Sequence, residues 1–117
     1  MADNVKGHLD SLLLAVLEDG PLHGYAVIEA LQQRSGGNLT LPTGTVYPAL
    51  RRLENAGWLD GSWSTVGGRR RRTYTLTTAG RHALSDHRTQ WMRFSGTIQS
   101  VLGGRGMGRP STNGGSP

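Results

Sequence analysis

The chain contains no cysteine. This absence excludes a disulfide framework, a thiolate metal site and a cysteine nucleophile. Aromatic residues are also scarce, at 6% of 117 residues, and the hydrophobic fraction is 35%. A single domain of this size can build only a modest core. A partner subunit that buries further apolar surface would compensate for this shortage.

Long apolar runs are missing as well. No stretch approaches the roughly 20 apolar residues that a membrane-spanning helix requires. The N-terminus has no basic segment followed by an apolar run, which is the pattern of a secretory signal. We therefore expect a soluble, cytoplasmic protein with no membrane partner.

Catalytic signatures are absent too. The sequence has no G-x-S-x-G elbow, no Walker loop, no H-E-x-x-H pair and no close pair of acids on one helix face. Its four histidines have no spacing with carboxylates that would hold a metal ion. We expect no enzyme activity, no cofactor and no metal site. The four histidines are His8, His23, His82 and His87.

The net charge of +5 is distributed unevenly. Residues 1–42 contain two basic and five acidic residues, a net charge of −3. Residues 43–88 contain eight arginines and three acids, a net charge of +5, and the remainder adds three arginines without an acid. Such segregated positive charge is typical of a protein that binds nucleic acid.

Apolar residues at spacings of three and four predict two helices in the first third of the chain. The first covers about residues 8–18 and ends at Gly20–Pro21. The second covers about residues 23–34 and ends at Gly36–Gly37. We expect its buried row to consist of Tyr25, Ile28 and Leu31.

A third helix follows in the segment TGTVYPALRRLENAGW. Its core face contains Val46, Leu50 and Leu53, and Thr43 is the expected N-terminal cap. Proline removes a hydrogen bond from a helix interior. We therefore expect the helix to begin at Gly44 or Thr45, so that Pro48 lies within the first turn.

Two short strands are expected next, over residues 58–64 and 73–76, with a hairpin turn at Gly67–Gly68. Arg69–Arg72 follow the turn and make this hairpin a basic wing. A long helix over residues 77–102 comes last, and residues 103–117 have the composition of a disordered tail. Apolar residues at alternating three- and four-residue steps form a seam on the long helix that predicts dimerisation: Leu84, His87, Trp91, Phe94, Ile98 and Val101.

This order of elements predicts a mainly α, α+β fold, a winged helix-turn-helix with a two-stranded wing. We assign residues 1–76 to a DNA-binding domain, residues 77–102 to a C-terminal dimerisation helix and residues 103–117 to the tail.

Three runs of residues resemble the PadR family of transcriptional regulators. They are Gly20-Pro-Leu-His-Gly-Tyr25, Gly44-Thr-Val-Tyr-Pro-Ala-Leu-Arg-Arg-Leu-Glu54, and the Gly67–Gly68 wing that leads to Thr77. The resemblance implies a homodimer that binds a palindromic operator on double-stranded DNA, usually as a repressor. It also implies that a small planar aromatic effector can relieve repression, with Trp91 at the position that lines the dimer pocket in some members.

The wing departs from the family pattern. Arg69 and Arg70 replace two prolines, and Thr73 replaces a tyrosine. We therefore expect a more flexible and more cationic wing.

The residues expected to contact DNA lie on the third helix and the wing. Arg51 is the candidate for a guanine edge, because a bidentate pair there discriminates bases by about 1–3 kcal/mol, and Arg52 is the candidate for a phosphate. Side chains alternate along a strand, so only about half of the wing arginines can face DNA. The full set is Thr43, Thr45, Tyr47, Pro48, Arg51, Arg52, Arg69, Arg70, Arg71 and Arg72.

Three alternatives stay open at this point. Trp91 either packs in the dimer interface or also stacks on a ligand. The whole protein either reads a specific operator or coats DNA without sequence preference, as nucleoid-like proteins do. A winged-helix module that binds another protein is the third class, although such a module would not need an exposed basic face.

Overall fold

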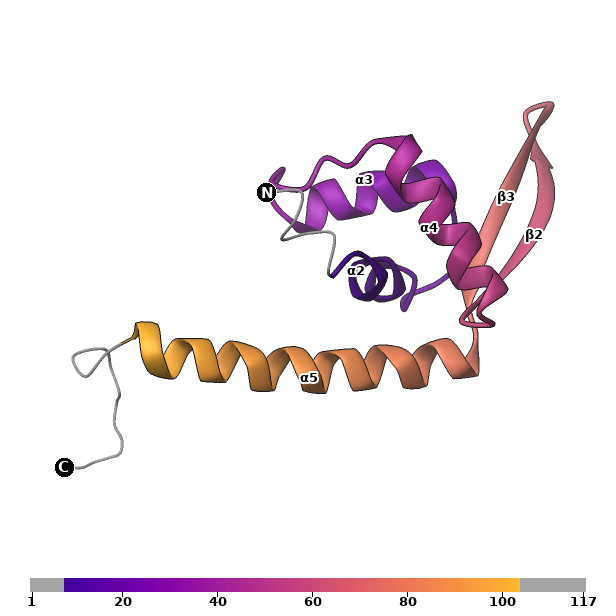
Figure 1. The fold of residues 1–117 in the computed structure, drawn as a ribbon. Helices are drawn as coiled ribbons and strands as arrows, with labels where there is room; N and C mark the ends of the chain where they lie inside the picture. The colour runs from indigo at the N-terminus through magenta and orange to yellow at the C-terminus, as the bar shows by residue number, and fades with distance from the viewer. Residues whose placement is uncertain (1–7, 104–117) are drawn as a thin grey trace. The chain divides into compact units, whose positions relative to one another are not determined.

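The computed structural model describes residues 8–103. The chain divides into two units, Met1–Ser85 and Asp86–Pro117. The helices α2, α3 and α4 and the strands β1, β2 and β3 belong to the first unit (Figure 1). Helix α5, Thr78–Leu102, begins in the first unit and makes up the described part of the second. The expected disordered tail lies outside the described residues, except for Gly103.

The element order is that of a winged helix-turn-helix, which confirms the expected α+β class. The bounds are α2 Leu9–Val16, β1 Leu22–His23, α3 Gly24–Arg34, α4 Thr43–Asn55, β2 Leu59–Val66 and β3 Arg69–Leu76. The two longer strands form a hairpin whose turn lies away from helices α2–α4 (Figure 1).

The sheet has three strands rather than the two expected. Its order is β1-β3-β2, with both pairs antiparallel. Leu22 pairs with Tyr74, and His23 pairs with Thr73. A strand of two residues directly after Pro21 contains no alternation that a sequence pattern could reveal.

One apolar core holds the three N-terminal helices against the base of the hairpin. Helix α2 contributes Leu13 and Leu14, and both are fully buried. The core also contains residues from every other element described in the first unit except β1. The largest fully buried side chains are Leu13, Leu14, Leu17, Val27, Val46, Leu50, Leu53 and Leu59.

The buried row of α3 differs from the expectation at one position. Tyr25 is 53% exposed, whereas Gly24, Val27, Ile28 and Leu31 are buried. These four residues follow the i, i+3, i+4, i+7 pattern that begins at Gly24, where the helix itself begins. Tyr25 follows Gly24 by one residue and therefore lies outside this buried row, so its ring points toward solvent.

The start of α4 also corrects the expectation. The backbone N–H groups of Thr45 and Val46 both donate to the carbonyl of Pro42, at 3.0 and 3.1 Å. Pro42 is therefore the N-terminal cap residue, Thr43 makes no side-chain cap, and the helix begins earlier than expected. Pro48 consequently lies in the second turn, inside the helix, where it removes a regular backbone hydrogen bond.

Helix α4 ends in a Schellman motif at Gly57, whose φ is +85°. The N–H of Trp58 donates to the carbonyl of Leu53 at 3.0 Å, and the N–H of Gly57 donates to the carbonyl of Glu54 at 3.0 Å. This end is joined to the start of α5. Thr77 Oγ1 donates to the Gly57 carbonyl at 2.7 Å and accepts from the N–H of Gly80 at 2.9 Å, so Thr77 caps α5.

The expected dimerisation seam divides between the two units. Leu84 is 3% exposed and belongs to the core of its own chain, so its assignment to the seam is wrong. Four members in the second unit are exposed: Trp91, Phe94, Ile98 and Val101. Within residues 8–103, no helix is both long and apolar enough for a membrane span.

The close contact at Gly80 leads to a stability prediction. A Cβ atom at Gly80 would lie 2.1 Å from the Trp58 carbonyl oxygen and 2.7 Å from Leu76 Cδ1. We expect Gly80→Ala to lower the free energy of unfolding by about 1–3 kcal/mol, because backbone must move to admit the methyl group. Denaturant unfolding measures the change.

Gly96→Ala is the matched control in the same helix. A Cβ atom at Gly96 has nothing within 4 Å. We expect this variant to be neutral or up to about 1 kcal/mol more stable, since alanine has the higher helix propensity. Equal effects of the two substitutions would contradict the steric explanation.

Candidate nucleic-acid interface

Helix α4 presents one polar face to solvent. Its opposite face is buried through Val46, Ala49, Leu50 and Leu53. This burial fixes the rotation of the helix about its axis, so the remaining side chains point outward. The six α4 residues expected to contact DNA are all exposed: Thr43, Thr45, Tyr47, Pro48, Arg51 and Arg52.

Tyr47 also packs against the preceding helix. Its Cε1 atom would lie 2.7 Å from a Cβ atom at Gly24, so only glycine admits the ring there. The tyrosine is still 39% exposed. One face of its ring therefore fixes α4 against the start of α3, and its remaining surface is available to a partner.

The two arginines of α4 have different surroundings. Arg52 donates a hydrogen bond to the carboxylate of Asp10 on α2, and 58% of its side chain remains exposed. Exposed ion pairs contribute about 0–1 kcal/mol, so this pair can exchange for a phosphate. Arg51 is exposed on the same surface and lies close enough to Tyr74 to act on its ionisation.

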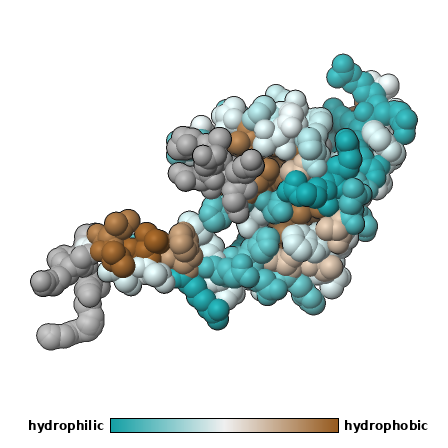
Figure 2. All heavy atoms as spheres, viewed as in Figure 1, coloured by the Kyte–Doolittle hydropathy of each residue, from teal (hydrophilic) through white to brown (hydrophobic). Residues whose placement is uncertain are grey.

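The hairpin separates its four arginines between two faces. Gly67 and Gly68 have φ values of +58° and +78°, as a two-residue type I′ turn requires. The register pairs Trp63 with Arg72, so these two residues lie on one face together with Arg70. Arg69 and Arg71 lie on the other face. Figure 2 shows the hairpin surface as strongly hydrophilic.

Two contacts occupy the face that contains Trp63. Arg72 Nε donates to Glu54 Oε1 at 3.2 Å, and a second guanidinium N–H donates to Glu54 Oε2. The hydrogen bond to Glu54 raises the pKa of Arg72. The guanidinium carbons of Arg70 and Arg72 lie 4.5 and 5.2 Å from the centroid of the Trp63 ring. Arg72 can therefore reach DNA only by leaving Glu54.

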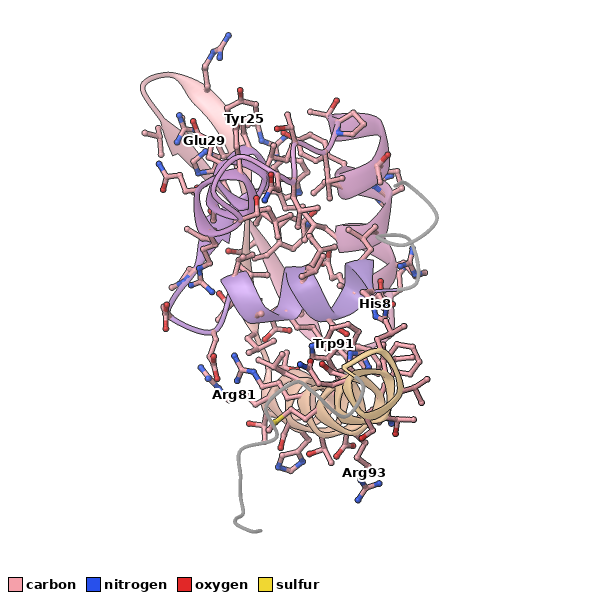
Figure 3. The ribbon with its side chains drawn as sticks, turned by 90° about the vertical axis from the view of Figure 1, so that its left-hand side faces the viewer. His8, Tyr25, Glu29, Arg81, Trp91 and Arg93 are labelled. Carbon is pink, nitrogen blue, oxygen red and sulfur yellow. The ribbon has the colours of Figure 1, made fainter. Side chains whose placement is uncertain are left out.

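Sequence patterns did not identify four exposed or partly exposed residues of α3, α4 and the hairpin. Tyr25 and Glu29 lie on the side of α3 that faces away from α2, as Figure 3 shows. The apolar pattern places Tyr25 in the core because it sets the start of the buried row at Tyr25 instead of Gly24. Trp63 could have been found, because a two-residue turn at Gly67–Gly68 fixes the register that places it opposite Arg72. Glu54 gave no such signal.

A metal site is not part of this surface. Among residues 8–103, no group of three or more histidine, aspartate or glutamate side chains is arranged to hold a metal ion.

Comparisons with known proteins identify the family of this chain. A family model described as the transcriptional regulator PadR-like family matches residues 13–86. A transcriptional regulator of Mycobacterium tuberculosis is 36% identical over 87 residues, which cover 74% of this chain and 76% of that protein.

Solved structures are similar too. A PadR family transcriptional regulator from Eggerthella lenta has a TM-score of 0.77 and 28% identity, over 88% of both chains. Bacillus subtilis PadR in complex with operator DNA has a TM-score of 0.62 and 26% identity, over 67% of this chain and 45% of that one.

Tyr74, which lies two residues after Arg72 on the same face of β3, leads to a pH prediction. Burial raises its pKa above 10.0, the Glu54 carboxylate raises it further, and Arg72 and Arg51 oppose the shift. The folded state therefore holds this proton more tightly than the unfolded state. The stabilisation is fully present below the unfolded pKa of about 10 and is lost as pH rises through the folded pKa.

Urea unfolding across this pH range tests the prediction. We expect the free energy of unfolding to decline above pH 10 by a larger amount in the natural protein than in Tyr74→Phe. Tyr25→Phe is the matched control, because it removes the same hydroxyl group from a half-exposed position. The prediction fails if Tyr74→Phe shows the same pH dependence as the natural protein.

Proposed function

This chain belongs to the PadR-like family of transcriptional regulators, and we propose that it is a homodimer that binds a palindromic operator on double-stranded DNA through α4 and the hairpin. The observation that carries the proposal is the exposed face of α4, which presents Arg51 beside a hairpin with four arginines. The operator complex of Bacillus subtilis PadR supports the same use of this fold. A regulator of this kind acts by binding, which agrees with the expectation of a non-enzymatic protein.

Helix α4 enters the major groove in this proposal. A B-DNA major groove admits an α-helix, and its base edges offer distinct donor and acceptor patterns. Arg51 reads a guanine edge, and Thr45 contacts a thymine methyl group or a phosphate. Tyr47 and Arg52 contact the DNA backbone beside them, as do Thr43 in the first turn of the helix and Pro48 in the second.

The hairpin contributes sequence-independent affinity. Arg69, Arg70 and Arg71 reach the phosphate backbone or the adjacent minor groove. If each subunit neutralises about four phosphates, the logarithm of the binding constant should fall with that of the salt concentration with a slope near −7.

The apolar face of α5 in the second unit is the proposed dimer interface, and a second copy of the chain is its occupant. Trp91, Phe94, Ile98 and Val101 repeat at steps of three and four and are 40–75% exposed. Figure 2 shows hydrophobic surface near the end of α5. The a/d spacing of this row suits an identical helix. Two recognition helices must lie about 34 Å apart to reach successive half-sites on DNA, and such a dimer can set that distance.

A planar aromatic effector is the proposed signal that ends repression. Trp91 is half exposed on the same face, and the centroids of the Trp91 and Phe94 rings lie 5.8 Å apart. An exposed indole favours offset stacking with a flat ligand. Arg88 and Arg93 outnumber the one nearby acid, Asp86, so a neutral or anionic ligand suits the site better than a cation.

A footprint on the DNA upstream of the protein's own gene tests the core of the proposal. Protection of a palindrome in the presence of excess random DNA is the expected result. The four wing arginines also suit a protein that coats DNA without sequence preference. Uniform binding without a footprint would favour that function, and no binding at low salt would favour a protein-interaction module.

Replacing Arg51 and replacing Arg70 should weaken DNA binding in different ways. We expect Arg51→Ala to weaken operator binding by about 1–3 kcal/mol and to leave random DNA almost unaffected, since it removes a base contact. We expect Arg70→Ala to weaken both by a similar factor and to lower the salt slope by about 0.9 per subunit. Fluorescence anisotropy titrations at several salt concentrations measure both effects. Equal losses on both DNAs for both variants would contradict this division.

The dimer interface has its own test. We expect Ile98→Asp to shift the protein to a monomer, because burying an unpaired carboxylate costs several kcal/mol. Thr97→Asp adds the same charge beside the proposed seam and should leave the dimer intact. Sedimentation velocity at micromolar concentration distinguishes the two. An unchanged dimer in Ile98→Asp would rule out this face as the interface.

A further inference from the structure

The contact between α4 and the hairpin depends on a missing side chain. A Cβ atom at Gly61 would lie 2.7 Å from Arg72 Nε and 2.8 Å from both carboxylate oxygens of Glu54. The φ of Gly61 is not in the left-handed region, so its backbone does not require glycine. Glycine is needed here because the ion pair occupies the space above the strand.

The ion pair itself differs from the others in the described chain. The side chains of Arg72 and Glu54 are 28% and 21% exposed, whereas those of Arg52 and Asp10 are 58% and 35% exposed. Two guanidinium donors each reach a different carboxylate oxygen, Nε donating to Oε1 and a terminal N–H to Oε2. This two-point geometry fixes orientation as well as distance. It therefore restricts how the hairpin can tilt against the last turn of α4.

Trp63 extends this contact toward the turn. It is paired with Arg72 across the two strands, and the guanidinium groups of Arg72 and Arg70 both lie over its ring. A guanidinium stacked on an indole is attracted electrostatically by the ring. Contacts therefore run without a break from Glu54 on α4 through Arg72 and Trp63 to Arg70 in the outer part of the hairpin.

We propose that Glu54, Gly61, Trp63 and Arg72 form a brace that sets the position of the hairpin relative to α4, and that Arg72 is a positioning residue rather than a DNA contact. This inference rests on the proposed function. Of the four wing arginines, Arg69, Arg70 and Arg71 then remain for DNA. The brace keeps these three arginines at a fixed distance from Arg51. Arg51 can then contact a base while the hairpin arginines contact the DNA backbone.

The Glu54→Gln variant distinguishes the brace from a purely electrostatic effect of Glu54 on DNA binding. Removing a negative charge near DNA should strengthen binding if Glu54 has no other role. If the brace is correct, Glu54→Gln and Arg72→Gln should each weaken operator binding by about tenfold while the salt slope stays unchanged. The double variant should lose no more than either single variant, because both act through one contact.

Arg71→Gln is the matched control. Arg71 is the neighbour of Arg72 on the opposite face of the strand. Because Arg71 is a proposed phosphate contact, its replacement should lower the salt slope of DNA binding by about 0.9 per subunit. The brace is overturned if Arg72→Gln lowers the slope as Arg71→Gln does, or if Glu54→Gln binds the operator as tightly as the natural protein.

A second measurement needs no DNA. Amide hydrogen exchange in the hairpin of the free, full-length protein should be faster in Glu54→Gln and Arg72→Gln but not in Arg71→Gln. If the natural protein lacks operator binding, the proposed function fails, and the exchange rates still decide whether the brace exists. Unchanged exchange in both brace variants would overturn it. Should one brace variant fail to fold, the other decides by the same two readouts.

Discussion

The rotation of α4 about its own axis is the constraint on which the rest of the proposed DNA-binding surface depends. Val46, Leu50 and Leu53 are at most 2% exposed, and each contributes roughly 1.5–3 kcal/mol by burial. The exposed pair of Arg52 and Asp10 contributes about 1 kcal/mol or less. The apolar row therefore decides which way the helix faces, and the direction of Arg51 is a consequence of that row.

Both ends of α4 are joined to other functional parts of the first unit. Near its start, the Tyr47 ring lies across Gly24 and fixes the angle to α3. At its end, the Gly57 carbonyl accepts from Thr77, the residue that caps α5, and Glu54 holds the hairpin. A displacement at the start of α5 or in the hairpin would thus reach α4 through these hydrogen bonds as well as through the shared apolar core.

Local patterns were sufficient to predict most of the elements, and errors arose where a long-range contact decided the outcome. Periodicity identified α3, α4, α5 and the hairpin, but it could not reveal β1, a two-residue strand defined only by its pairing with β3. Tyr25 was misplaced because the phase of α3 depends on its start at Gly24. Leu84 fits the seam by spacing, yet the core of its own chain buries it. The partner of Arg72 is 18 residues away, so no local pattern could identify it.

The wing shows how one run of identical residues can serve two purposes. Arg69 and Arg70 stand where the resemblance to the family implies two prolines, so the sequence alone favours a flexible hairpin. In the structure, the strand pairing continues without interruption to Val66 and Arg69, and Arg70 stacks on Trp63. This pairing and stacking connect the outer part of the hairpin to its base. Because side chains alternate along β3, the same run leaves Arg69 and Arg71 on one face and places Arg70 and Arg72 on the other, where both lie over Trp63 and only Arg72 also binds Glu54.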